Sequence, residues 1–284
     1  MIKFIIISRH KPGMTRERFF YEWAYIHVAL MVQTASSMRR FTRYVQHYAN
    51  PDIGDEHRLL PHPPQDWESY ADHGLARFEA YGPAPDYLAI MRPHSFSDSA
   101  MEIVYLEGRT EYRRDDFRPD GVKLIHRLAR RPGMTPDEFR RHWRDDHVPR
   151  LVEALRTRGL RKYDTCLPHE IDLDALRASR KGTLFDSAEV NTADGVEELW
   201  FDTLEDAMRL GSDPALRQSL SASYASFTDI GQSYSMFAQE RVVFDFVTPG
   251  ETTPRPAVLD DNSLEARLFK SGRPFHEPRP VEPS

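Results

Sequence analysis

The sequence predicts an α+β protein built from two ferredoxin-like β-α-β-β-α-β domains. These would pack sheet to sheet as a pseudo-dimeric α+β barrel with an extended C-terminal arm. Residues 3–32 and 123–152 align without a gap and share 11 identities, among them a tryptophan and a histidine. Both copies then follow the same order of apolar and amphipathic stretches, and the chain ends in a proline-rich stretch. We therefore expect domains at 1–118 and 119–247 and an arm at 248–284.

Each copy begins with an apolar, β-branched stretch that predicts a strand, at Ile2–Arg9 and at Val122–Leu128. A Pro-Gly turn and a helix follow. In the second copy, Thr135-Pro136-Asp137-Glu138 has the pattern of a capping box with proline at the first helical position. Pro149 predicts that this helix ends soon after His147.

The rest of each copy predicts the remaining strands and the second helix. The second strands are expected at Arg40–Tyr48 and Leu160–Leu167, followed by a loop at Asn50–Asp66, which we expect to be exposed, and a polar loop at Pro168–Asp194. A strand, a helix and a last strand should come next, at Leu75–Tyr81, Pro85–Met91 and Met101–Glu107, and at Gly195–Phe201, Thr203–Ala222 and Phe237–Phe246. One face of each sheet would lack helices, so we expect the two bare faces to pack together.

The arm, Thr248–Ser284, combines prolines with apolar side chains such as Leu264 and Leu268. Prolines keep a chain extended and lower the entropy lost when it becomes ordered. We therefore expect the arm to dock, either on its own chain or on a second copy to give a homodimer. The alternative is a disordered tail.

Composition excludes several classes of function. The net charge is −6, and acidic and basic residues alternate along the chain, which argues against a nucleic-acid partner. Cys166 is the only cysteine, so there is no internal disulfide and no cysteine-based metal site. No apolar run reaches the ~20 residues of a membrane span. We expect a cytoplasmic protein without a membrane partner and without a metal.

Histidines and tyrosines are the candidate catalytic residues. His147 and His27 each lie four residues after a tryptophan on a helix face, and a histidine can act as general acid or base near neutral pH. The alternative is that both are core histidines. His126 stands where the first copy has Ile6, and it would be catalytic if its strand face is the barrel interior. Tyr163 and Tyr44 occupy matching places in the second strands and could polarise a carbonyl, or could simply pack.

Large aromatic side chains supply the candidate substrate-binding surface, although for the tryptophans and phenylalanines the core is the favoured interpretation. These residues are Trp143, Trp23, Tyr224, Phe227 and Tyr234. The sequence lacks a glycine-rich phosphate loop, a Rossmann fingerprint and a serine-hydrolase elbow, so nucleotide cofactors and serine hydrolysis are disfavoured.

The repeated pattern resembles EthD domains, which are part of the dimeric α+β barrel superfamily. The second copy is the better match, with Arg-Arg-Pro-Gly-Met-Thr-Pro-Asp-Glu-Phe at 130–139, then Trp143 and Asp146-His147-Val148-Pro149. The first copy has Ile26 and Ala29 where the family prefers Asp and Pro. The resemblance covers roughly residues 1–110 and 121–247. It implies a small cyclic or aromatic ligand, with His, Tyr or Asp moving protons and often no cofactor.

Three functions remain open. The first is a cofactor-independent lyase or isomerase, dehydratase- or decarboxylase-like, which acts on a small aromatic or phenolic compound by histidine acid–base catalysis. The second is a non-catalytic binding protein for an apolar metabolite. The third is a haem-binding, monooxygenase-like protein. We expect catalysis in the second copy, because it keeps the fuller motif and adds His126.

Overall fold

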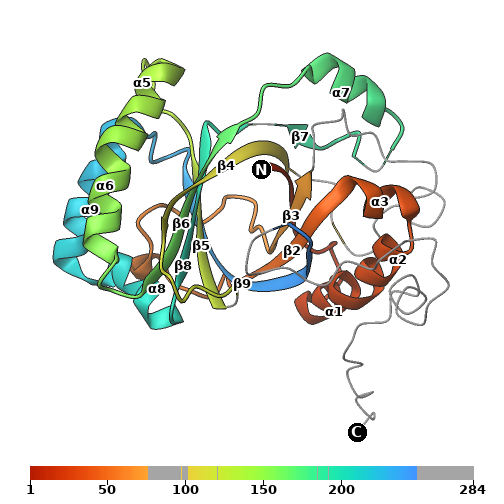
Figure 1. Cartoon of the computed structure of the whole chain (residues 1–284), viewed down its shortest axis with the longest axis horizontal. Helices are drawn as coiled ribbons and strands as arrows, with labels where there is room; N and C mark the ends of the chain where they lie inside the picture. The colour runs from red at the N-terminus through yellow and green to blue at the C-terminus, as the bar shows by residue number, and fades with distance from the viewer. Residues whose placement is uncertain (76–96, 98–101, 120, 184, 191, 248–284) are drawn as a thin grey trace, which may run out of the picture.

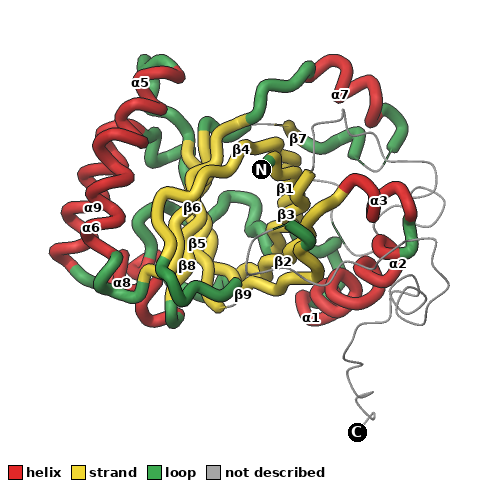
Figure 2. Tube along the Cα trace, in the orientation of Figure 1, coloured by secondary structure: helices red, strands yellow, loops and turns green. Residues whose placement is uncertain are grey.

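Within residues 1–75, 97, 102–119, 121–183, 185–190 and 192–247, which the computed structural model describes, the chain forms one closed barrel of eight antiparallel strands (Figures 1 and 2). The order around the barrel is β1-β3-β2-β9-β5-β8-β6-β4, and β4 pairs with β1 to close it. The strands are β1 (Ile2–Ser8), β2 (Phe41–Ala49), β3 (Ser69–Leu75), β4 (Glu102–Arg113), β5 (Gly121–Leu128), β6 (Leu160–Pro168), β8 (Gly195–Phe201) and β9 (Tyr234–Asp245). The short β7 (Glu189–Val190) adds to β4 in parallel.

The predicted pair of ferredoxin-like sheets packed face to face is wrong. The two copies share a single hydrogen-bonded sheet, because the last strand of each copy is long enough to pair with one strand of its own copy and one strand of the other copy. β4 has 12 residues and pairs first with β1 and then with β6. β9 also has 12 residues and pairs first with β5 and then with β2. The faces without helices therefore line one barrel interior instead of meeting as two sheets.

Most strand positions agree with the sequence prediction. β1, β2, β5, β6 and β8 begin and end within one or two residues of their expected bounds. The third strand of the first copy was expected at Leu75–Tyr81, but β3 lies earlier and ends at Leu75. Residues 76–81, the helix expected at Pro85–Met91 and the arm Thr248–Ser284 lie outside the described residues.

Helices of the two copies cover different sides of the barrel (Figure 1). The second copy contributes α5 (Pro136–Arg141), α6 (Val148–Leu155), α8 (Leu204–Ser212) and α9 (Pro214–Phe227), and the first contributes α1 (Arg16–Tyr21), α2 (Val28–Val32) and α3 (Ala35–Arg40). The polar loop of the second copy carries α7 (Leu173–Arg180). The predicted capping box is confirmed, since Thr135 and Glu138 exchange hydrogen bonds at the start of α5.

Each copy carries a π-helical turn after its first helical segment, η1 (Glu22–His27) and η3 (His142–His147). The expected end of the helix near His147 is wrong, because α6 continues directly from η3. Pro149 is the second residue of α6, directly after the π-helical turn. Single π-helical turns often occur at functional sites. Each of the two turns carries one buried tryptophan and one buried histidine.

The loop Asn50–Asp66 is not the exposed loop that the sequence predicted. It contains a short 3-10 turn, η2 (Asp55–His57), and its Ile53, Leu59 and Leu60 pack in the core of the second copy. Ser235 of β9 donates a hydrogen bond to the Leu60 carbonyl at 2.9 Å. The first copy thus completes the hydrophobic core of the second.

A buried ionic network lies inside the barrel, on the strand faces that no helix covers. At its centre Glu198 accepts hydrogen bonds from Lys3 Nζ at 2.5 Å and from Tyr70 at 2.9 Å, and Lys123 Nζ lies 3.2 Å away. Burial alone would raise the pKa of Glu198, but Lys123 and Lys3 hold it well below its ordinary value. Lys3 and Tyr70 belong to the first copy, so Glu198 ties the two copies together.

Candidate functional site

A row of directly paired residues crosses the second copy on the helix-covered face of the sheet. Glu197 of β8 pairs in register with His126 of β5 on one side and with Thr165 of β6 on the other. Thr165 in turn pairs with Arg109 of β4. Residues that pair directly across antiparallel strands point to the same face. His126 therefore lies under the helices, and the expectation that it might face the barrel interior is wrong.

Glu197 is fully buried and accepts three short hydrogen bonds. Its Oε1 accepts from the Tyr163 hydroxyl at 2.6 Å and from the Trp143 indole N–H at 2.5 Å. Its Oε2 accepts from the Tyr224 hydroxyl at 2.6 Å. Tyr163 comes from β6, Trp143 from η3 and Tyr224 from α9, so the carboxylate gathers donors from the sheet and from two helical segments.

His126 is held through one ring nitrogen only. Its Nδ1 lies 2.8 Å from the Tyr224 oxygen and 3.2 Å from Glu197 Oε2. Because the Tyr224 hydroxyl donates its proton to Glu197, both oxygens can only accept from Nδ1, which therefore carries the hydrogen. The Nε2 atom is buried and has no hydrogen-bond partner among the described residues. Its lone pair is available to accept a proton.

His147 approaches the same carboxylate from η3. Its Nε2 lies 3.4 Å from Glu197 Oε1, and its Nδ1 lies 2.8 Å from the Ser223 hydroxyl. The imidazole packs against the rings of Tyr224 and Phe227, with centroid distances of 4.3 and 5.0 Å. The two histidines thus lie on either side of one buried glutamate.

The charges of this cluster favour an ionised Glu197. Burial alone would raise the pKa of Glu197, but the charge of His147 and the hydrogen bond from His126 bring it well below its ordinary value. Burial, together with the nearby charge of Glu197, raises the pKa of Tyr163 and of Tyr224 well above the ordinary value. Both tyrosines therefore remain protonated donors.

The first copy keeps the histidine and the tyrosine but has lost the carboxylate. The strand pairing places Ala71 and Ile6 where the second copy has Glu197 and His126. His27 and Tyr44 lie with their ring centroids 6.5 Å apart, and the Gln46 amide donates to the Tyr44 oxygen and to the Trp23 carbonyl. Among the described residues, the strand position that corresponds to Glu197 therefore carries no acid.

The structure brings together five of the ten residues that the sequence singled out, namely His147, His126, Tyr163, Trp143 and Tyr224. Phe227 lies at the edge of this cluster, against His147. Tyr234 lies apart from it, in the barrel interior, with its hydroxyl 3.5 Å from Glu102. Trp23, His27 and Tyr44 form the separate group of the first copy.

Sequence reasoning missed Glu197 as a site residue. The available signal was a pair of adjacent acids, Glu197 and Glu198, inside an otherwise apolar strand. Successive strand residues point to opposite faces, so one acid had to lie under the helices and the other inside the barrel.

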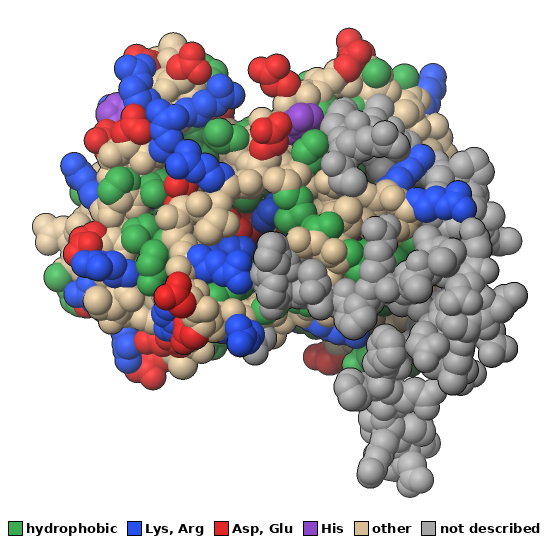
Figure 3. Space-filling model, viewed as in Figure 1, with side chains coloured by type: hydrophobic (Ala, Val, Ile, Leu, Met, Phe, Trp, Pro, Cys, Tyr) green, Lys and Arg blue, Asp and Glu red, His purple; other side chains and the backbone are tan. Residues whose placement is uncertain are grey.

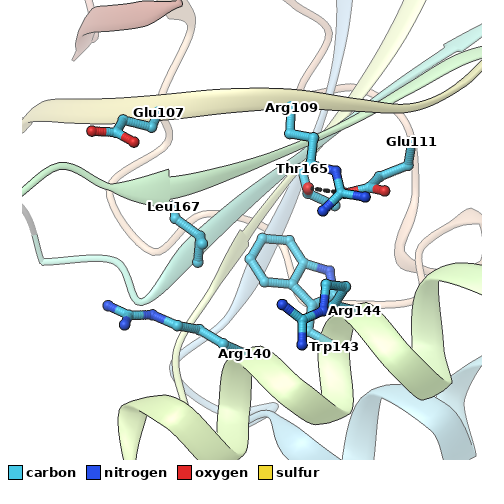
Figure 4. Close-up of a pocket in the computed structure, with 8 residues that line it drawn as sticks. All are labelled: Glu107, Arg109, Glu111, Arg140, Trp143, Arg144, Thr165 and Leu167. Atoms are coloured by element: carbon cyan, nitrogen blue, oxygen red, sulfur yellow. Dashed lines mark hydrogen bonds and ion pairs between the residues drawn. The ribbon is translucent and has the colours of Figure 1, made fainter.

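A cleft beside Trp143 leads from the surface toward this cluster. It has a volume of about 130 Å³ and lies between the helical segment α5–η3 and the strands β4 and β6 (Figure 4). Its lining residues are Glu107, Arg109, Glu111, Arg140, Trp143, Arg144, Thr165 and Leu167. The Trp143 indole separates the cleft from Glu197, to which it donates a hydrogen bond. Gly195 leaves room for the indole, because a Cβ there would lie 2.4 Å from a ring carbon.

Two kinds of feature are absent from the part of the chain that the structure describes. None of the helices there has the length and apolar character needed to cross a membrane. No group of three or more His, Cys, Asp or Glu side chains there is placed to hold a metal ion.

Comparison with solved structures finds distant likenesses. Two candidate monooxygenases, from Fusobacterium nucleatum and Lactobacillus acidophilus, are each 8% identical over 85% of this chain, covering 93% and 94% of theirs, with TM-scores of 0.45 and 0.44. An aldoxime dehydratase crystallised with butyraldoxime is 10% identical over 86% of this chain and 79% of its own, with a TM-score of 0.23. Likenesses at this level say nothing about chemistry.

No curated protein matches the chain. A family model does match, in two segments that correspond to the two copies. The EthD domain model covers residues 11–90 and 131–231, and the second segment contains the Glu197 cluster except His126. The predicted resemblance is therefore confirmed: the chain belongs to the EthD domain family and carries the domain twice.

Proposed function

We propose that the second copy carries a proton-transfer site in which His126 is the base and Glu197 orients it. The site would act on a small aromatic or phenolic compound as a lyase or isomerase, and the step itself would use no cofactor. The observation that carries this proposal is the buried, unpartnered Nε2 of His126, whose other ring nitrogen is held by Glu197 and Tyr224. A carboxylate that fixes the tautomer of a histidine in this way prepares the opposite nitrogen to accept a proton.

The other members of the cluster have supporting roles in this proposal. Glu197 would stabilise the imidazolium that forms when His126 takes a proton. Tyr163 and Trp143 hold Glu197 in place through their hydrogen bonds. His147 is the second acid, since its imidazole lies across the carboxylate from His126 and would return a proton to the leaving hydroxyl or to the product carbon.

A second candidate function is the binding of an apolar metabolite without turnover. It is favoured by the position of Trp143, whose indole closes the cleft before Glu197. In that case ligand would occupy the cleft and never reach His126. Turnover that depends on His126 distinguishes the two functions.

Elimination of 5-nitrobenzisoxazole by the purified protein tests the proposal. A base removes the ring C–H proton, the N–O bond breaks and a coloured nitrophenolate forms, so no other reactant is needed. We expect His126→Gln and Glu197→Gln to lower the rate above buffer about 100-fold, the size of a typical general-base contribution. His142→Gln should leave the rate unchanged, because His142 is exposed and pairs with Asp146. His27→Gln should also leave it unchanged. A rate that survives His126→Gln contradicts the proposal, and a loss confined to His27→Gln places the site in the first copy.

A further inference from the structure

We infer that the cleft beside Trp143 recognises the carboxylate of a ring-bearing ligand through the guanidinium groups of Arg109 and Arg144. This inference rests on the proposed function, because it names the class of compound that would reach His126. It gives that compound an acidic group at one end and the proton to be removed at the other.

The shape of the cleft suits a single ring. Its volume is about 130 Å³, and an apolar cavity of about 150 Å³ holds benzene. The flat indole of Trp143 and the side chain of Leu167 supply apolar walls on opposite sides (Figure 4). An aromatic ring can stack on such an indole in an offset or edge-on arrangement.

Positive charge exceeds negative charge in the lining of the cleft. Three arginines and two glutamates contribute to it, and both glutamates already have partners. Glu111 accepts a hydrogen bond from Thr165 at 2.7 Å and lies 3.4 Å from Arg109, while Glu107 pairs with His169. Figure 3 shows basic side chains over α5, interleaved with acidic ones.

Arg144 can exchange its present partner for a ligand at little cost. Arg144 pairs with Asp145, and both side chains are more than half exposed, at 58% and 52%. Exposed ion pairs of this kind contribute about 0–1 kcal/mol. A ligand carboxylate in the cleft would instead be partly shielded from water and could take two parallel N–H donors from one guanidinium group. The cleft therefore favours a carboxylate over a neutral group of the same shape.

The position of the arginines places the acid group of the ligand at the end of the row that is farthest from His126. Arg109 begins the row of paired residues that continues through Thr165 and Glu197 to His126. Neighbouring strands lie about 4.8 Å apart, so three steps separate Arg109 from His126 by about 14 Å. A ligand anchored by its acid group would lie at the Arg109 end of this row, with its ring against the Trp143 indole.

Calorimetric titration of the full chain with benzoate, and with benzamide as the neutral isostere, tests this inference. We expect benzoate to bind about tenfold more tightly than benzamide, the difference expected for one charge-assisted hydrogen bond. Arg109→Gln and Arg144→Gln should each weaken benzoate binding about tenfold and leave benzamide binding unchanged. Arg156→Gln removes the same charge from an exposed pair with Glu153 outside the cleft, and should change neither affinity.

The binding experiment separates this inference from the proposed function. Glu197→Gln should lower turnover about 100-fold while benzoate affinity is retained within about twofold. Tighter binding of benzoate than of benzamide, without any turnover, would support carboxylate recognition by the cleft and contradict the catalytic proposal. Equal affinity for benzoate and benzamide, no binding of either, or an equal loss in Arg156→Gln would overturn the inference.

Discussion

Replacing Glu198 with alanine should lower the free energy of unfolding by about 3–5 kcal/mol, the cost of breaking a buried ion pair from one side. The substitution leaves Lys3, Lys123 and the Tyr70 hydroxyl without their shared acceptor in the barrel interior. Both lysine side chains are almost fully buried, so water cannot replace the lost carboxylate. Burial itself already lowers the pKa of Lys123, which shows how poorly this interior tolerates an uncompensated charge.

Urea unfolding at neutral pH measures this effect. Glu153→Ala is the matched control, since Glu153 is 72% exposed and its loss should cost less than about 1 kcal/mol. The pKa of Glu198 is depressed in the folded protein, so its contribution is present above the unfolded pKa of ~4.3 and is lost as the pH falls below it. The difference between wild type and Glu198→Gln should therefore shrink in acid. A Glu198→Ala variant within 1 kcal/mol of wild type would contradict the central role of this network.

Separating the copies should abolish folding. Fragments 1–118 and 119–284 break the barrel at two ladders, β2–β9 and β4–β6, and each cut exposes unpaired strand edges. The second fragment also loses Ile53, Leu59 and Leu60 from its core. We expect neither fragment to unfold cooperatively on its own, and we expect the two to form a one-to-one complex when they are co-expressed.

Circular dichroism during thermal unfolding, together with mass in solution, checks this expectation. The full chain serves as the reference, because it contains both ladders and the complete core. Two monomeric fragments that each unfold cooperatively would show that each copy closes its own sheet, which would contradict a shared barrel.

Local elements could be predicted from the sequence, because they depend on neighbouring residues. The spacing of Trp143 and His147 placed both on one helix face, and the Thr135–Glu138 box marked the start of α5. The substitution of His126 for Ile6 pointed to a polar position in an apolar strand. These signals are short-range, and five of the residues chosen in this way meet in one cluster.

Closure of the barrel could not be predicted in the same way. It depends on the register between β4 and β6 and between β9 and β2, which joins residues about 50 or more positions apart. Glu197 was missed because its role follows from what lies across the strands, namely His126 and Thr165. Helical periodicity alone could not predict the π-helical turn η3, which lets the chain continue through Pro149.

The protonation state of the His126 imidazole tests the central claim most directly. Nitrogen NMR of protein labelled in its histidine rings distinguishes a protonated ring nitrogen from one that carries a lone pair, and His126→Gln assigns the signals. In the neutral ring we predict a proton on Nδ1 and a free lone pair on Nε2, with this tautomer preference lost in Glu197→Gln. A wild-type His126 with its proton on Nε2, or a tautomer unaffected by Glu197→Gln, would contradict the proposed base.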